Sequence, residues 1–148
     1  MKQTNHVAEI TISYKPAISS KPIITSALDA YTELIEFFPK QTIALQERFV
    51  CMYLNRSNRL LGVHTLSTGG ITGTVADVRL ILSIALKTAA TGIILAHNHP
   101  SGNLKPSYQD EQITQKVKQA AELMDIKLLD HLIISPAGDY FSMMENIN

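Results

Sequence analysis

The chain has 148 residues, 45% of them hydrophobic and 18% charged, which is enough for one domain with a substantial apolar core. Its 13 basic and 13 acidic residues give a formal net charge of zero. Direct binding to nucleic acid is therefore disfavoured, because such binding draws most of its affinity from excess basic charge. The single cysteine, Cys51, excludes a disulfide framework and a thiolate metal cage. No apolar run approaches the roughly 20 residues of a membrane span, so we expect a cytoplasmic protein without membrane contacts.

The first 23 residues are expected to form an N-terminal strand and a connection ahead of a domain at 24–148. Hydrophobic Ile10 and Ile12 alternate with polar residues, and this alternation predicts a half-buried strand over residues 7–14. No internal repeat or second domain is indicated, so the whole chain is interpreted as one compact domain.

Three helices are predicted, each at a Ser/Thr-x-x-Asp sequence of the capping-box type, at residues 26–29, 74–77 and 107–110. The first helix should end before Pro39. The second is apolar around much of its circumference and should be widely covered. The third is predicted to face inward with Ile113, Val117, Ala120 and Met124.

The strands are predicted from apolar runs between turn residues. Residues 44–54 are apolar on both faces beyond Arg48, as in a central strand, and residues 59–66 can return as its hairpin partner. Further strands are expected at 93–96, 127–135 and 140–143. Strands and helices in this order predict an α/β fold with a mixed β-sheet flanked by helices.

The buried strand at 93–96 leads directly to His97 and His99. Residues two apart on a strand face the same side, so both imidazoles can bind one ion. Asp110 lies on the predicted inward face of the third helix, where it could be a third ligand, although it also fits a simple capping residue. Two imidazoles and one carboxylate leave the fourth tetrahedral position of Zn²⁺ for water, as in catalytic zinc sites.

A catalytic zinc site of this kind also needs a general base. Zinc lowers the pKa of a bound water to ~7, and another group must take its proton. Glu47 is our candidate, because it stands at the entrance of a central strand that could neighbour the histidine strand. An ordinary exposed glutamate is an equally good interpretation on chemistry alone, and Asp77 and Asp130 remain alternatives for the base.

Other polar features have less specific interpretations. Asp130 and His131 could act in an outer shell around the metal ligands or form a structural pair. The glycine-rich stretch at 69–73 could border a substrate cleft, although a plain connection is favoured. An HNH nuclease is disfavoured, because its three motif residues are spread over a ββα element instead of being adjacent.

The combined pattern carries a family resemblance. His97-x-His99, seven residues, Ser107, two residues and Asp110, with an upstream acidic residue, resembles the JAMM (MPN/JAB) metalloprotease motif. The sequence His-Asn-His-Pro-Ser-Gly, the later Pro-Ser-x-x-Asp and the Leu-Asp-His at 129–131 are similar to the RadC group of that superfamily. The resemblance covers about residues 24–145.

The resemblance implies a cytidine-deaminase-like α/β fold of the JAMM type. It implies Zn²⁺ bound by His97, His99 and Asp110, with Glu47 as general base and Ser107 stabilising the oxyanion. The implied reaction is hydrolysis of a peptide or isopeptide bond in a protein or peptide substrate, and a homo-oligomer is compatible with it. The competing interpretation is a non-enzymatic or accessory module in DNA repair or DNA processing that uses the same fold.

Overall fold

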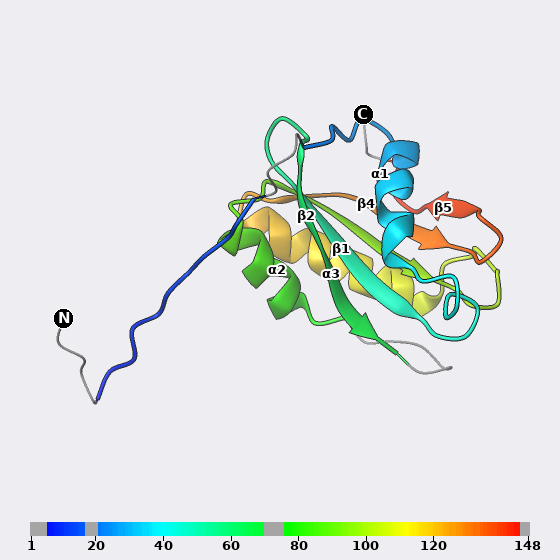
Figure 1. Cartoon of the computed structure of the whole chain (residues 1–148), viewed down its shortest axis with the longest axis horizontal. Coiled ribbons are helices and arrows are strands. Elements are labelled where there is room, and N and C mark those ends of the chain that lie inside the picture. The colour runs from blue at the N-terminus through cyan, green and yellow to red at the C-terminus, as the bar shows by residue number, and fades with distance from the viewer. Residues whose placement is uncertain (1–5, 17–20, 70–75, 146–148) are drawn as a thin grey trace.

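The structure is a computed structural model, and it describes residues 6–16, 21–69 and 76–145. One sheet carries all the described strands, in the order β2-β1-β3-β4-β5 (Figure 1). Strands β3 and β4 are parallel, and the other neighbours are antiparallel, so the predicted mixed sheet of an α/β fold is confirmed. The elements are α1 (Ala27–Leu34), a 3₁₀ turn (Ile35–Phe37), β1 (Arg48–Leu54), β2 (Leu60–Thr68), α2 (Val78–Lys87), β3 (Gly92–Asn98), α3 (Tyr108–Leu123), β4 (Lys127–Ile134) and β5 (Tyr140–Ser142).

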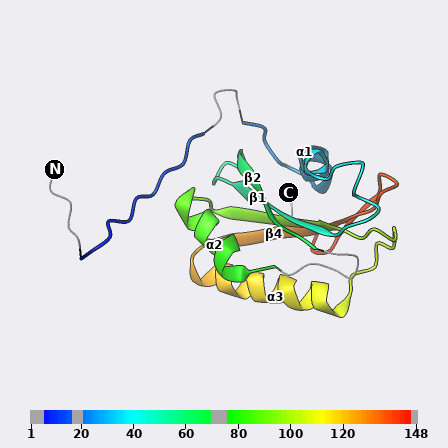
Figure 2. The same cartoon turned by 60° about the horizontal axis from the view of Figure 1, so that its bottom comes forward.

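Helices cover both faces of the sheet, with α1 on one side and α2 and α3 on the other (Figure 2). Successive side chains of a strand point to opposite faces, so the two faces carry separate apolar clusters. On β1, Val50 packs in the cluster under α1, and its neighbour Cys51 packs in the cluster that contains residues of α2 and α3. Among the described residues, no helix has the length and apolar character to cross a membrane.

The strand register brings three chain segments to one edge of the sheet. Phe49, near the start of β1, pairs with His97, near the end of β3. His97 also pairs with Ile133 at the end of the parallel strand β4. The start of β1 and the carboxyl ends of β3 and β4 therefore meet, and the residues that precede or follow these strands lie close together.

The strand predicted at 7–14 is wrong. Residues 7–16 have no regular secondary structure, and the side chain of Ile10 is 88% exposed. Tyr14 contacts the sheet by donating its hydroxyl hydrogen to the main-chain oxygen of Leu61 at 2.6 Å. Alternation shows that a segment is compatible with a sheet, but a strand also needs a neighbouring strand with free main-chain groups.

The predicted surroundings of α2 and α3 need correction. Helix α2 is not covered around much of its circumference, because Leu86 is 55% exposed and only Ile81 and Ala85 are buried on it. Its N-cap is Asp77, and Thr74 lies outside the described residues. On α3, Val117 is buried as predicted, but Thr114 and Ala121 are buried in place of the predicted Ile113 and Ala120, and Met124 is 51% exposed.

Candidate metal centre

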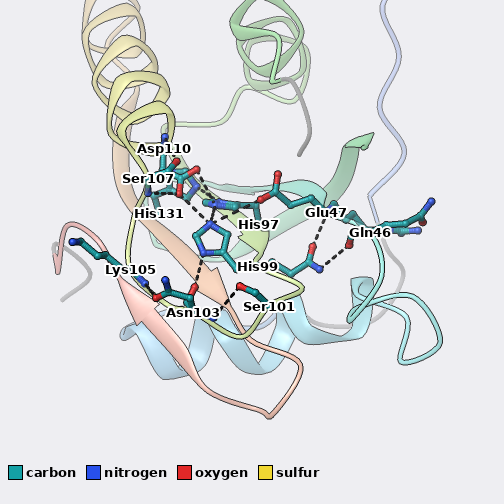
Figure 3. Close-up of polar contacts among 12 residues, drawn as sticks. Gln46, Glu47, His97, His99, Ser101, Asn103, Lys105, Ser107, Asp110 and His131 are labelled. Atoms are coloured by element: carbon teal, nitrogen blue, oxygen red, sulfur yellow. Dashed lines mark hydrogen bonds and ion pairs between the residues drawn. The ribbon is translucent and has the colours of Figure 1, made fainter. Parts of the chain in front are cut away.

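Three ligand atoms converge at this edge of the sheet (Figure 3). The Nε2 atoms of His97 and His99 lie 3.0 Å apart. Asp110 approaches both, with Oδ1 3.1 Å from His97 Nε2 and Oδ2 3.1 Å from His99 Nε2. Tetrahedral ligands bound to zinc at about 2.1 Å are separated by roughly 3.4 Å. The three atoms are therefore close to the spacing needed to share one ion.

The turn after β3 orients His99. Its main-chain N–H donates to Ile134 O of β4 at 3.0 Å, and Gly102 closes the turn with a φ of 84° that favours glycine. His99 Nδ1 lies 2.6 Å from the main-chain oxygen of Asn103. A carbonyl oxygen can only accept, so Nδ1 carries a hydrogen, and in the neutral ring Nε2 is left with the lone pair that faces Asp110.

Asp110 is held by the start of α3. Ser107 is the N-cap, its Oγ accepts from Asp110 N at 3.0 Å, and Asp110 Oδ2 accepts from Ser107 N at 2.8 Å. Burial raises the pKa of Asp110, but its contacts with His97 and His99 outweigh burial and hold that pKa well below its usual value. The same contact with Asp110 raises the pKa of His99.

The donor chemistry fits a divalent metal. When His99 is neutral, its Nε2 and the ionised Asp110 Oδ2 present lone pairs to each other at 3.1 Å. Two acceptors at this distance repel unless a proton or cation lies between them. Imidazole nitrogen and carboxylate oxygen are both ligands of zinc. The residues present are therefore suited to a metal ion.

Glu47 lies slightly farther out. The ligand atoms of Glu47, His97 and His99 are within 4.8 Å of one another, so this group could hold a metal ion. Glu47 Oε1 is 3.9 Å from His99 Nε2, whereas Asp110 is 3.1 Å from the same atom. Asp110 therefore has the shorter distance to His99, and Glu47 is the next carboxylate outward.

Asn98 positions Glu47, and the sequence did not indicate this role. It stands between the two histidines in sequence, so its fully buried side chain points to the opposite face of the strand. Asn98 Oδ1 accepts from Arg48 N at 2.7 Å, and Nδ2 donates to the main-chain oxygen of Gln46 at 2.8 Å. The residues on either side of Glu47 are therefore both hydrogen-bonded to the same side chain of β3. A polar residue inside an otherwise apolar buried strand was the available signal.

His131 contacts the candidate ligand His97 on the side away from Asp110. This position agrees with the interpretation of His131 as an outer-shell residue. Its Nε2 is 2.8 Å from His97 Nδ1, and its Nδ1 is 2.6 Å from Thr114 Oγ1. Burial lowers the pKa of His131 well below its usual value. Thr114 was not identified from the sequence, although a polar residue one turn after Asp110 on an inward helix face would have been the signal.

The two alternative acids have other roles. Asp130 is buried and accepts from the hydroxyl of Ser142 and from Met144 N, so it fastens β5 and the residues after it to β4. Asp77 accepts from Arg79 N and Leu80 N at the start of α2. Among the described residues, neither carboxylate contacts His97 or His99, although Asp130 also accepts from the main-chain N–H of His131 at 2.7 Å. Glu47 is therefore the acid that the fold brings beside the candidate metal ligands.

A groove of about 620 Å³ opens beside these residues. Glu47, His97 and Asp110 line it, and the α3 residues Gln112, Lys116 and Gln119 extend its wall away from Asp110. Of the glycine-rich stretch predicted at 69–73, only Gly69 is described, and its N–H donates to Glu47 O at 2.7 Å. The remaining part, 70–73, lies outside the described residues.

The fold and donor set define an α/β domain with a candidate metal site at the carboxyl end of a sheet strand. The family model of the RadC-like JAB domain matches residues 24–147, and the chain belongs to this family. The resemblance noted in the motif is thereby confirmed at the level of the family.

Proteins named UPF0758 are similar to this chain. The protein of Flavobacterium johnsoniae is 46% identical over 124 residues, which are 84% of this chain and 53% of the relative. The protein of Porphyromonas gingivalis is 45% identical over 122 residues, or 82% and 52%. The protein of Streptococcus gordonii is 48% identical over 101 residues, or 68% and 44%. The chain thus spans about half the length of these curated relatives.

Proposed function

We propose that this protein is a zinc-dependent hydrolase of the RadC/JAMM type that cleaves a peptide or isopeptide bond. The observation that carries the proposal is the convergence of His97, His99 and Asp110 at 3.0–3.1 Å, with Glu47 Oε1 3.9 Å from His99 Nε2. Three protein ligands with an open fourth position are typical of catalytic zinc, whereas structural zinc is usually closed by four.

The proposed chemistry divides between the metal and the chain. When bound, zinc would supply Lewis acidity, which lowers the pKa of a water molecule and polarises a carbonyl group. Glu47 would accept the proton of the attacking water and return it to the leaving amine, as a general base and then a general acid. Asn98 supports this role by holding the main chain on both sides of Glu47.

Ser107 is the proposed oxyanion-stabilising residue. Its Oγ accepts a hydrogen bond from Asp110 N, and this bond leaves the hydroxyl hydrogen available for another acceptor. A hydroxyl donated to the oxygen of the scissile carbonyl would stabilise the charge that develops there. Proximity to Asp110 supports the role, although the groove lining itself includes Asp110 and not Ser107.

The groove supports a polymeric substrate. It continues past Asp110 along successive turns of α3, where glutamine side chains can donate and accept hydrogen bonds with a peptide main chain. The phenyl ring of Phe49 and the side chain of Ile113 add apolar lining. A protein or peptide segment that lies along α3 would bring one of its bonds to the edge where Glu47 and the histidines meet.

Glu47→Gln tests the proposal. The amide keeps the size of the side chain but cannot take a proton, so we expect zinc binding to be retained and turnover to fall by about 10²–10⁴-fold. Zinc content is measured by elemental analysis, and turnover on a peptide library by mass spectrometry. Glu36→Gln, on the 3₁₀ turn outside the site, is the matched control.

The trapped form can identify the substrate. Proteins that remain uncleaved and bound to Glu47→Gln, but not to the wild type, would be candidates for proteomic identification. Less than half an equivalent of zinc in wild-type protein purified with zinc would contradict the proposed function. Salt-dependent DNA binding without cleavage of any peptide bond would favour the accessory DNA-processing module instead.

A further inference from the structure

A buried hydrogen-bonded chain runs from His97 through His131 to Thr114. His97 Nδ1 lies 2.8 Å from His131 Nε2, and His131 Nδ1 lies 2.6 Å from Thr114 Oγ1. Thr114 Oγ1 in turn lies 2.6 Å from the main-chain oxygen of Asp110. The exposed fractions are 1% for His97, 0% for His131 and 4% for Thr114, so bulk water does not compete for these contacts.

The direction of every hydrogen in this chain follows from its last acceptor. The main-chain oxygen of Asp110 can only accept, so the single hydroxyl hydrogen of Thr114 is donated to it. Thr114 Oγ1 must then accept from His131 Nδ1–H. A neutral His131 protonated on Nδ1 accepts at Nε2, and the hydrogen between the two histidines therefore belongs to His97 Nδ1.

The opposite direction would disable the ligand. If Thr114 donated to His131, then His131 Nε2–H would donate to His97 Nδ1, and His97 would carry its own hydrogen on Nε2. That atom is the one that faces Asp110 Oδ1 at 3.1 Å. A protonated Nε2 has no lone pair to offer a metal ion, so the choice of tautomer decides whether His97 can bind.

We propose that Thr114 and His131 are positioning residues that hold His97 in the Nδ1-protonated tautomer, with its Nε2 lone pair presented to the metal. The chain begins at one ligand and ends on the main chain of another, Asp110, so a single network sets the orientation of both. This inference rests on metal binding in the proposed function and does not require that the substrate be a peptide.

Packing keeps the rings in place for this role. The ring of Phe49 stacks on His97 with a centroid distance of 5.9 Å and an interplanar angle of 5°. The same ring meets His131 edge-on at 5.6 Å. Phe49 is itself buried, so rotation of either imidazole would require displacement of a core side chain.

Thr114→Val is the primary test. Valine keeps the branched shape and removes the hydroxyl, so His131 is free to adopt either tautomer. We expect zinc affinity to fall about 10–100-fold, the usual effect of losing an outer-shell partner, and Thr114→Ser to restore most of it. Thr88→Val is the matched control, because Thr88 Oγ1 also donates to the carbonyl four residues earlier, Ile84 O at 2.9 Å, but has no described contact with a histidine.

A second readout does not depend on metal binding. Long-range ¹H–¹⁵N spectra of the metal-free wild type at alkaline pH report which ring nitrogen of His97 carries hydrogen, and we expect Nδ1. In Thr114→Val we expect a mixture of the two tautomers. Affinities are measured by competition with a chromophoric chelator, and circular dichroism establishes that each variant is folded.

Several results would overturn the inference. These are Nε2 protonation of His97 in the metal-free wild type, unchanged zinc affinity in Thr114→Val, or a loss that Thr114→Ser does not restore. A wild type that binds no zinc but shows the Nδ1 tautomer would instead contradict the proposed function while leaving the hydrogen-bond direction supported. The wild-type spectrum decides the direction even if Thr114→Val does not fold.

Discussion

Asp29 and Asp110 occupy the same position in two helices of this protein. Each lies three residues after a serine N-cap, at the start of α1 and of α3 respectively. In each case the serine Oγ accepts from the main-chain N–H of the aspartate, at 3.1 Å for Ser26 and 3.0 Å for Ser107. The local sequence therefore starts both helices in the same way.

The two carboxylates differ in what surrounds them. Asp29 turns back along its own chain, where one oxygen accepts from Thr25 N at 2.9 Å and from Thr25 Oγ1 at 2.8 Å. Asp110 accepts from Ser107 N with one oxygen and faces His97 and His99 with both. A capping motif predicts the start of a helix, and the strand that lies opposite decides whether its carboxylate becomes part of a site.

The largest contrast is expected for metal binding. Asp110→Asn removes the anionic ligand and leaves two imidazoles, so we expect zinc affinity to fall by about 100-fold or more. Asp29→Asn should leave zinc affinity unchanged. Chelator competition on both variants, with helix content from circular dichroism, measures the difference. If Asp110→Asn still bound one equivalent of zinc with wild-type affinity, Asp110 would not be a metal ligand, and the two aspartates would not differ in function.

A smaller contrast is expected for the serine caps. Ser26→Ala and Ser107→Ala should each lower the free energy of unfolding by about 1 kcal/mol in metal-free protein, because each removes an N-cap acceptor. Ser107→Ala should in addition weaken zinc binding roughly tenfold, since Asp110 loses a partner that orients it. Urea unfolding and zinc titration give the two quantities. Equal zinc affinity in the two variants would mean that Ser107 acts on the helix alone.

The smallest effect is expected for the pH dependence of the stability that Asp29 contributes at the start of α1. Hydrogen bonds from Thr25 lower the pKa of Asp29 below its usual value of 3.8. The resulting stabilisation is complete above the unfolded pKa and is lost as the pH falls through the folded pKa. In metal-free protein the wild type should therefore melt slightly above Asp29→Asn at pH 6, with the difference shrinking as the pH falls below 3.8 and through the folded pKa. A difference that does not shrink as the pH is lowered would exclude the ionised carboxylate as its cause.

Much of the fold could be predicted from local pattern. The apolar run at Arg48–Leu54 and the short run before His97 are strands, and the capping sequence at 107–110 does start α3. Periodicity could not predict the absence of a strand at 7–14, because strand formation depends on a partner elsewhere in the chain. It also misplaced the inward face of α3, where polar Thr114 is buried against His131.

In the site, too, local spacing predicted some residues, whereas others depend on contacts between distant parts of the chain. Spacing indicated His97, His99 and Asp110 as neighbours, and the structure brings their ligand atoms within 3.1 Å, although their roles and that of Ser107 stay predictions. Chemistry alone did not separate Glu47 from Asp77 and Asp130; the family resemblance implied Glu47, and the pairing of β1 with β3 brings it beside the histidines. The roles of Asn98 and Thr114 could not be predicted from the sequence, because the main-chain and ring atoms that they contact belong to residues distant in sequence.

The hydrogen bonds of Asn98 also fix the alignment of two strands. A strand that slips by one residue against its neighbour moves every side chain to the opposite face of the sheet. If β1 slipped against β3, Glu47 would leave the face that carries His97 and His99, and the bonds from Asn98 to Gln46 and Arg48 would break together. Asn98 therefore helps to fix the strand register: the same bonds that stabilise the pairing of β1 with β3 favour the alignment in which Glu47 faces the candidate metal ligands.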